Sequence, residues 1–342
     1  MKSTLELFLA GHENLRTAHA AEEATKLGVL RAGNTGVLDH KGNPVGSCAR
    51  KAYLRMVGVE VEPVDATKSL MFDAGNGNED LWVRVLEAAK EDGLVLKGEE
   101  ELGLEWFLAD GRKVSGRPDI VLGKQVASSG PSGSEPGFVP ERGIELKLVS
   151  SLWTARDVLF KGKPKTVHLM QAGHYAWRMG IPFEIWYTSR CNFAVTDYSE
   201  SRFFARKNFP KQGDALSEYC SYNEQGDILG IEPFIVGYRV EWNTKGQLMY
   251  TPIAEGADSV ATFITQKGIE DYYALISSAE RTDKLPSRPV NKEADGERGG
   301  FDLCKERYCK LAGVCAAHEK SGLKQWLGGV TQALAMGGAR DE

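Results

Sequence analysis

The sequence predicts an α/β fold in which a central mixed β-sheet is flanked by helices. Two short segments, residues 116–122 and 143–148, carry aliphatic and β-branched side chains in the pattern of strands. Residues 69–90 and 167–178 show helical patterns, the first with glycines near its start. Further elements are expected along the chain: a strand at 183–188, a hairpin at 231–253 and a helix at 257–280.

The two predicted strands carry three charged residues that are costly to place in a core. Because side chains alternate between the faces of a strand, Glu145 and Lys147 are expected on one face and Ile144 and Leu146 on the other. Asp119 adds a charge from the neighbouring strand. Two carboxylates can bind Mg²⁺ or Mn²⁺ while waters occupy the ion's other coordination positions. A lysine next to such a water can assist metal-dependent hydrolysis of a phosphodiester. The alternative is two strands with solvated charges on an open face.

Composition indicates an ordinary soluble protein with an uneven charge distribution. The chain has 342 residues, 42% hydrophobic and 26% charged, and a net charge of −5. No run approaches the ~18 apolar residues of a membrane helix, and no signal peptide is visible, so we expect a cytoplasmic protein without a membrane partner. Residues 141–213 hold 12 Lys/Arg and 6 Asp/Glu, a net +6. That basic region fits nucleic-acid binding, and it fits a solvated surface helix almost as well.

The order of the three charged residues resembles the PD-(D/E)XK nuclease superfamily, in its RecB-like branch. The motif is written here as Arg117-Pro118-Asp119 followed by Glu145-Leu146-Lys147. The resemblance implies that Asp119, Glu145 and Lys147 are catalytic. It also implies that Asp119 and Glu145 bind Mg²⁺ or Mn²⁺ together with the main-chain carbonyl of Leu146.

Two further motifs extend the resemblance beyond the strands. Glu79 lies four residues after Gly75, and the branch has a Gly-xxx-His or Gly-xxx-Glu metal ligand on a helix before the Asp strand. A surface glutamate is the alternative. His168, Gln171 and Tyr175 share one face of the helix expected at 167–178. Gln-xxx-Tyr after the Glu-x-Lys strand is a signature of the branch, which implies that Gln171 and Tyr175 are active-site residues along the DNA backbone. A solvent-exposed polar stripe is the alternative.

The cysteines predict a second metal site. Cys304, Cys309 and Cys315 lie within 12 residues, and structural zinc and iron–sulfur sites commonly take four ligands. Cys48, in the first turn of a helix capped by Ser47, is the natural fourth. This arrangement, one N-terminal and three C-terminal cysteines, resembles that of the iron–sulfur subgroup of RecB-like nucleases. The subgroup includes AddB nuclease domains and CRISPR-associated exonucleases, and the resemblance implies a [4Fe–4S] cluster. The wider spacing of the last three leaves zinc, or unligated thiols, open.

The resemblance covers about residue 45 to residue 318 and implies three regions. These are an N-terminal helical region (1–68) with one cluster cysteine, a restriction-endonuclease-like core (69–256), and a C-terminal helix with the three-cysteine segment (257–342). A helical iron–sulfur layer would then be formed by both chain ends. The implied activity is that of a phage or prokaryotic DNA exonuclease in recombination, repair or processing, with single-stranded or ended DNA as substrate. The alternatives are a non-catalytic DNA-binding iron–sulfur subunit and an RNA substrate.

Overall fold

The computed structural model describes two compact units of the chain. The first takes its described residues from Met1–Asp73, Gly103–Arg117 and Phe263–Glu342, and the second from Ala74–Leu102 and Pro118–Thr262. The three regions expected from the sequence remain a prediction. The described residues are 29–57, 66–89, 94–98, 101–126, 137–195, 209–214, 216–282, 284–286, 292–293, 296–297 and 315.

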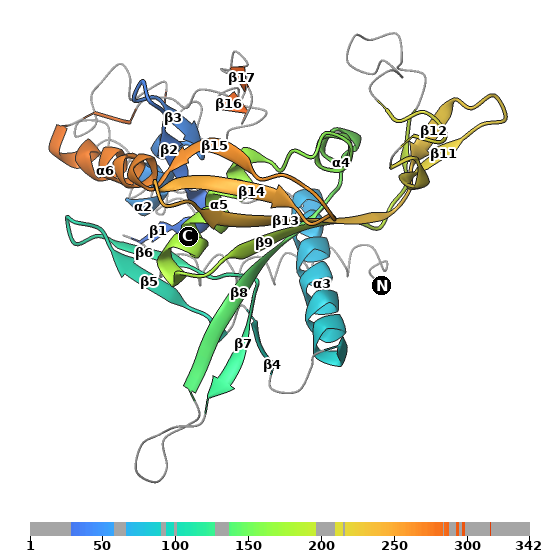
Figure 1. Ribbon diagram of the computed structural model, residues 1–342. Coiled ribbons are helices and arrows are strands. Elements are labelled where there is room, and N and C mark those ends of the chain that lie inside the picture. The colour runs from blue at the N-terminus through green and yellow to red at the C-terminus, as the bar shows by residue number, and fades with distance from the viewer. Residues whose placement is uncertain are drawn as a thin grey trace, which may run out of the picture. The chain divides into compact units, whose positions relative to one another are not determined.

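A seven-stranded mixed sheet dominates the second unit, in the order β15-β14-β13-β9-β8-β7-β4 (Figure 1). Strands β8 and β9 are parallel, whereas β4–β7, β7–β8, β9–β13 and β13–β14 pair antiparallel. The bounds are β4 Leu94–Gly98, β7 Ile120–Val126, β8 Gly137–Leu148, β9 Phe183–Ser189, β13 Phe234–Trp242, β14 Gln247–Pro252 and β15 Val260–Thr265. With helices flanking this sheet, the α/β architecture expected from the sequence is confirmed.

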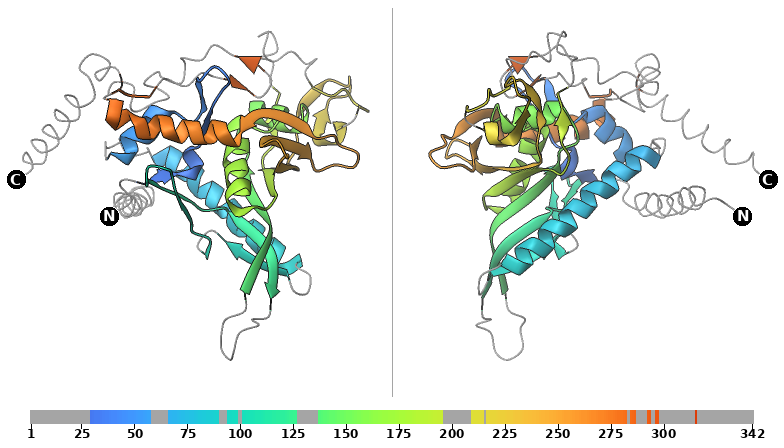
Figure 2. Two further views of the ribbon diagram at one scale, coloured as in Figure 1. Left: turned by 60° about the vertical axis from the view of Figure 1, so that its left-hand side comes forward. Right: turned by 90° about the vertical axis from the view of Figure 1, so that its right-hand side faces the viewer.

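Helix α3 (Ala66–Ala89) covers one face of the sheet through an apolar cluster. Figure 2 shows the helix lying along strands β7 and β8. Trp82, Val83 and Leu86 of α3 pack against buried aliphatic side chains of the sheet. Those side chains are Ile120, Leu122, Ile144 and Leu146. We call this the α3 face; burial of such side chains contributes about 1.5–3 kcal/mol each.

Helix α5 (Thr166–Met179) covers the opposite face. The indole N–H of Trp242 on β13 donates to the Gly173 carbonyl at 2.8 Å. Tyr175 packs on Phe183 of β9 with ring centroids 5.7 Å apart. The Phe183 ring in turn lies over β8, where a Cβ at Gly143 would clash with it. Glycine at 143 therefore allows the aromatic ring to close over the strand that carries the charged motif.

Smaller elements complete the second unit. Helix α4 spans Leu152–Leu159. A three-stranded sheet has the order β10-β12-β11. The bounds of its strands and of the neighbouring 3₁₀ helix are β10 Phe193–Ala194, β11 Cys220–Tyr222, β12 Ile228–Ile231 and η5 Ser217–Tyr219.

The first unit is built around helix α6 (Gln266–Thr282). Tyr272 and Tyr273 of α6 are buried, and the Tyr272 hydroxyl donates to the Ser47 carbonyl at 2.9 Å. The other elements among its described residues are β1 Leu30–Arg31, η1 Ala32–Asn34, β2 Gly36–Leu38, β3 Pro44–Gly46, α2 Ala49–Met56, β5 Leu104–Phe107, β6 Lys113–Gly116, β16 Lys292–Glu293 and β17 Gly296–Glu297. Strands β1, β6 and β5 form one small sheet, and β2 pairs with β3.

Three local predictions are wrong. Residues 116–122 are not one strand: β6 ends at Gly116 and β7 begins at Ile120, because Pro118 lacks an amide hydrogen and restricts the residue before it. The helix expected at 257–280 begins only at Gln266, because the preceding β-branched residues form edge strand β15 beside β14. Cys48 is itself the residue before the first turn of α2 rather than within that turn.

Within the described residues, no helix is both long enough and apolar enough to cross a membrane.

Candidate active site

The strand register brings Asp119 beside Glu145, as the sequence predicts. Ile120 of β7 pairs with Ile144 of β8, so the preceding residue, Asp119, lies against the next positions of β8. The main-chain N–H of Leu146 donates to Asp119 Oδ2 at 2.6 Å. A charge-assisted bond of this kind orients the carboxylate, because it fixes one oxygen on the neighbouring strand.

Glu145 and Lys147 share one face of β8 and form an ion pair with each other. The Glu145 side chain is fully buried, whereas the Lys147 side chain keeps 21% of its surface exposed. A buried carboxylate requires a charged partner, and Lys147 Nζ donates to Glu145 Oε1. The alternative of solvated charges on an open face is therefore wrong for Glu145. We call the side of the sheet that bears this pair the charged face.

Three carboxylates act on the Lys147 ammonium. Burial lowers the pKa of Lys147, but the negative charges of Glu145, Asp119 and Glu79 outweigh it, and the pKa of Lys147 lies above its ordinary value. The lysine is therefore protonated at neutral pH and acts as a donor. Asp119, Glu145 and Glu79 come from three different elements, which shows that the fold gathers them around one cation.

Contacts between α3 and the end of β9 fix the helix segment next to Glu79. Arg190 donates to Asn78 Oδ1 at 3.1 Å and to the Gly77 carbonyl at 3.4 Å. Asn78 is only 1% exposed, although Asn76 and Gly77 directly before it are exposed. One turn later, the Trp82 indole donates to Thr188 Oγ1 at 3.2 Å. Glu79 thus projects from a helical turn that is anchored on both sides.

The α5 face expected to carry His168, Gln171 and Tyr175 is turned mainly toward the sheet. Tyr175 is 2% exposed, so the alternative of a solvent-exposed stripe is wrong for this residue. Gln171 is partly exposed. The predicted contact of Gln171 and Tyr175 with a nucleic-acid backbone remains a prediction, and Tyr175 as placed packs on Phe183.

Tyr187 is a site residue that sequence reasoning did not identify. It lies on β9 directly across from Lys147, is fully buried, and contacts His168 through its hydroxyl at 2.9 Å. Its sequence context, an aromatic residue in the apolar segment Phe183–Ser189, is that of an ordinary core position. Arg190 was missed for a similar reason, since a lone arginine after a strand carries no signal of its partner.

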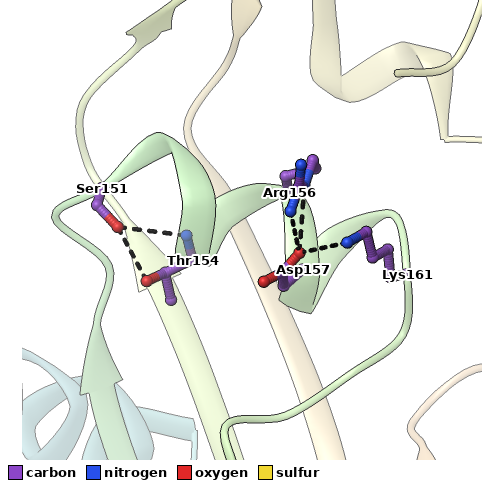
Figure 3. A network of polar contacts seen from close by, with 5 residues as sticks. All are labelled: Ser151, Thr154, Arg156, Asp157 and Lys161. Carbon is purple, nitrogen blue, oxygen red and sulfur yellow. Dashed lines mark hydrogen bonds and ion pairs between the residues drawn. The ribbon is translucent and has the colours of Figure 1, made fainter. Parts of the chain in front are cut away.

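Helix α4 and the loop that follows it, residues 160–165, carry a polar network (Figure 3). Ser151 caps the helix by accepting the Thr154 N–H at 3.2 Å. Asp157 accepts from Arg156 at 2.8 Å and from Lys161 at 2.9 Å. These two hydrogen bonds outweigh burial and hold the pKa of Asp157 below its usual value. Asp157 thereby offsets part of the positive charge at the start of this loop.

The cysteine site predicted from the sequence is described only in part. Cys304 and Cys309 lie outside the described residues. Cys48, half-buried, is the residue before α2, and Cys315 is half-buried and helical. A shared cluster of Cys48, Cys304, Cys309 and Cys315 therefore remains a prediction.

The oxygen ligands of the candidate site suit a hard cation that takes only a few of its ligands from the protein. Within the part of the chain that the structure describes, no group of three or more His, Cys, Asp or Glu side chains is arranged to hold a metal ion. Asp119 and Glu145, with the Leu146 carbonyl, offer only oxygen ligands. Mg²⁺ is commonly held by one or two carboxylates plus waters and substrate phosphates, so this smaller set is sufficient for it.

Comparison with known proteins leaves the chain without an assigned relative: no protein-family model, no curated protein and no solved structure matches it.

Proposed function

We propose that the chain is a Mg²⁺- or Mn²⁺-dependent deoxyribonuclease that hydrolyses phosphodiester bonds. The observation that carries the proposal is the buried group on β7 and β8, in which Asp119 is tied to Leu146 and Glu145 is paired with Lys147. A fully buried carboxylate is expensive, and a buried ion pair often contributes nothing to stability compared with apolar residues of the same volume. The ion pair lies beside a second carboxylate, Asp119, which a main-chain hydrogen bond holds on the neighbouring strand. This combination supports a catalytic role.

Each residue takes a role that follows from its contacts. Asp119 and Glu145 would hold the cation with the Leu146 carbonyl, and Glu79 is the further ligand that the resemblance implies. The bound ion would polarise the scissile phosphate and lower the pKa of a water. Lys147 would orient the attacking water or help to deprotonate it, and it would stabilise charge that develops on the phosphate oxygens.

The restriction-endonuclease-like core, the Gln171 and Tyr175 contacts and the [4Fe–4S] or zinc site belong to the same proposal. The net +6 of residues 141–213 supports an anionic substrate. Iron or zinc content of the purified protein, measured by elemental analysis and by anaerobic absorbance, tests the cysteine site separately. Absence of both metals would remove that part and leave the strand site untouched.

Cleavage of labelled single- and double-stranded DNA in Mn²⁺ tests the activity. Asp119→Asn keeps an oxygen that can accept the Leu146 N–H and removes the charge, so we expect a loss of about 100-fold or more in cleavage rate with the fold retained. Lys124→Ala is the matched control, because Lys124 is an exposed lysine paired with Glu141 on the same two strands. Equal rates for Asp119→Asn and wild type, or no cleavage by wild type, would contradict the proposal. Labelled RNA run in parallel separates the RNA alternative.

A further inference from the structure

The hydroxyl of Tyr187 organises the start of helix α5 next to Lys147. The main-chain N–H of Lys165 donates to this oxygen at 3.0 Å, and Nδ1 of His168 lies 2.9 Å from it. The rings of His168 and Tyr187 are 5.6 Å apart. Strand register places Tyr187 beside Lys147, so one buried phenol connects the loop before α5 to the charged face.

The hydrogen-bond roles follow from the number of protons available. Burial raises the pKa of Tyr187 far above its ordinary value, so the phenol keeps its proton. Its oxygen already accepts from the Lys165 N–H, and its own proton is available for Nδ1 of His168. Burial, followed by the charges of Lys147 and Lys165, lowers the pKa of His168 well below its ordinary value. A neutral imidazole that accepts at Nδ1 carries its proton on Nε2, which leaves that edge of the ring as a donor.

Donors and positive charge therefore gather on one side of the site. Lys147 and Lys165 both act electrostatically on His168, and the described neighbours that shift its pKa include no carboxylate. Lys165 is exposed, and among the described residues it forms no ion pair. Partial burial lowers the pKa of Lys165, and the charge of Asp157 opposes this effect. Lys161, four positions earlier on the same loop, is itself paired with Asp157 at 2.9 Å. Of these two lysines, Lys165 is therefore the one without a direct carboxylate partner among the described residues.

We propose that Lys165 and His168 form a binding subsite for a backbone phosphate adjacent to the scissile one, with Tyr187 as the positioning residue that fixes the imidazole. The subsite deepens the proposed nuclease function and rests on it. An ammonium and a neutral N–H donor suit the oxygens of a singly charged phosphodiester. The side chain of Lys165 can be removed without loss of its main-chain bond to Tyr187, so its charge can be tested apart from the architecture.

The test is the salt dependence of binding to a fluorescein-labelled single-stranded oligonucleotide, measured by anisotropy with the full-length chain and without divalent ions. Each phosphate contact that a single strand loses reduces the slope of log K against log salt by about 0.7. We expect Lys165→Ala to reduce the slope by about that amount and Lys161→Ala to leave it nearly unchanged. Equal effects of the two substitutions, or no effect of Lys165→Ala, would overturn the proposal.

A second pair of variants tests the imidazole. His168→Phe removes the donor, and His168→Gln restores a side-chain N–H; we expect about tenfold weaker binding for the first and partial recovery for the second. Tyr187→Phe should reproduce part of the His168→Phe loss while the salt slope stays that of wild type. Equal binding by His168→Phe and wild type would overturn the role of the imidazole. The DNA-cleavage assay of wild type is a separate measurement: cleavage without the Lys165 effect removes only the subsite, whereas absent cleavage removes the proposed function.

Discussion

The two faces of strand β8 are stabilised in opposite ways. On the α3 face, Ile144 and Leu146 lie in an apolar cluster with Trp82 and Leu86. On the charged face, the alternate positions Glu145 and Lys147 form an ion pair beneath a helix whose aromatic and polar side chains contact the neighbouring strand. Burial of apolar side chains on the α3 face stabilises the fold. On the charged face, removing charges from water costs free energy that offsets part of this stabilisation. The comparison indicates that the α3 face contributes more to the stability of the fold than the charged face does.

The largest effect should come from breaking the ion pair on one side only. Lys147→Ala removes the ammonium that pairs with the buried Glu145 carboxylate, and we expect a loss of about 3–5 kcal/mol in the free energy of unfolding. The double variant Glu145→Gln with Lys147→Met removes both charges and should recover most of that loss. Urea denaturation monitored by tryptophan fluorescence measures both. A double variant no more stable than Lys147→Ala would show that the pair itself stabilises the sheet.

A truncation on the other face of the same strand sharpens the contrast. Leu146→Ala should destabilise the fold by about 3 kcal/mol, because it leaves a cavity in the α3-face cluster, while its main-chain N–H and carbonyl stay in place. We therefore expect cleavage per folded molecule to stay within about threefold of wild type. Denaturation curves and cleavage rates, measured below the unfolding transition, give the two numbers. A loss of activity as large as that of Asp119→Asn would contradict the expectation that the α3 face contributes to stability and the charged face to activity.

The helix over the charged face predicts how stability depends on pH. Burial, with a smaller contribution from Arg178, lowers the pKa of His174 to about 3, so the folded state binds fewer protons than the unfolded chain at pH 5. Because its folded pKa lies below the unfolded value of about 6.5, this histidine disfavours folding increasingly as pH falls below about 6.5. Between pH 7 and pH 5 the expected loss is about 2 kcal/mol.

Denaturation at the two pH values, compared between wild type and His174→Gln, isolates this contribution. The variant should show a smaller difference between pH 7 and pH 5 than wild type. An identical difference in both proteins would show that His174 titrates normally or does not titrate in this range.

The smallest effect is expected where α3 meets the end of β9. Arg190→Ala removes the donor to Asn78 and Gly77, and we expect about 1 kcal/mol of destabilisation together with about tenfold slower cleavage through misplacement of Glu79. Arg84→Ala is the control, because this exposed arginine on the same helix donates, among the described residues, to the Asp80 carbonyl of its own helix. Equal cleavage rates for both variants would show that the anchor is dispensable for the site.

Local pattern was sufficient for much of the framework. Alternation correctly separated Ile144 and Leu146 from Glu145 and Lys147, and helical spacing located α3 and α5 to within a few residues. The hairpin expected at 231–253 is also present, as strands β13 and β14 joined by a short polar segment. Helix α4 was not expected, and the boundary between β15 and α6 was placed wrongly because residues 260–265 are ambiguous until β14 is beside them.

The amino-acid order alone placed Glu145 and Lys147 on one face of a strand and Asp119 on the neighbouring strand, because alternation along a strand can be read without any partner. Only the folded arrangement identified Tyr187 and Arg190, and only it turned Tyr175 toward Phe183. The reason is physical: alternation along a strand is a local property of the chain, whereas a hydroxyl that meets a histidine 19 positions away depends on how strands and helices pack.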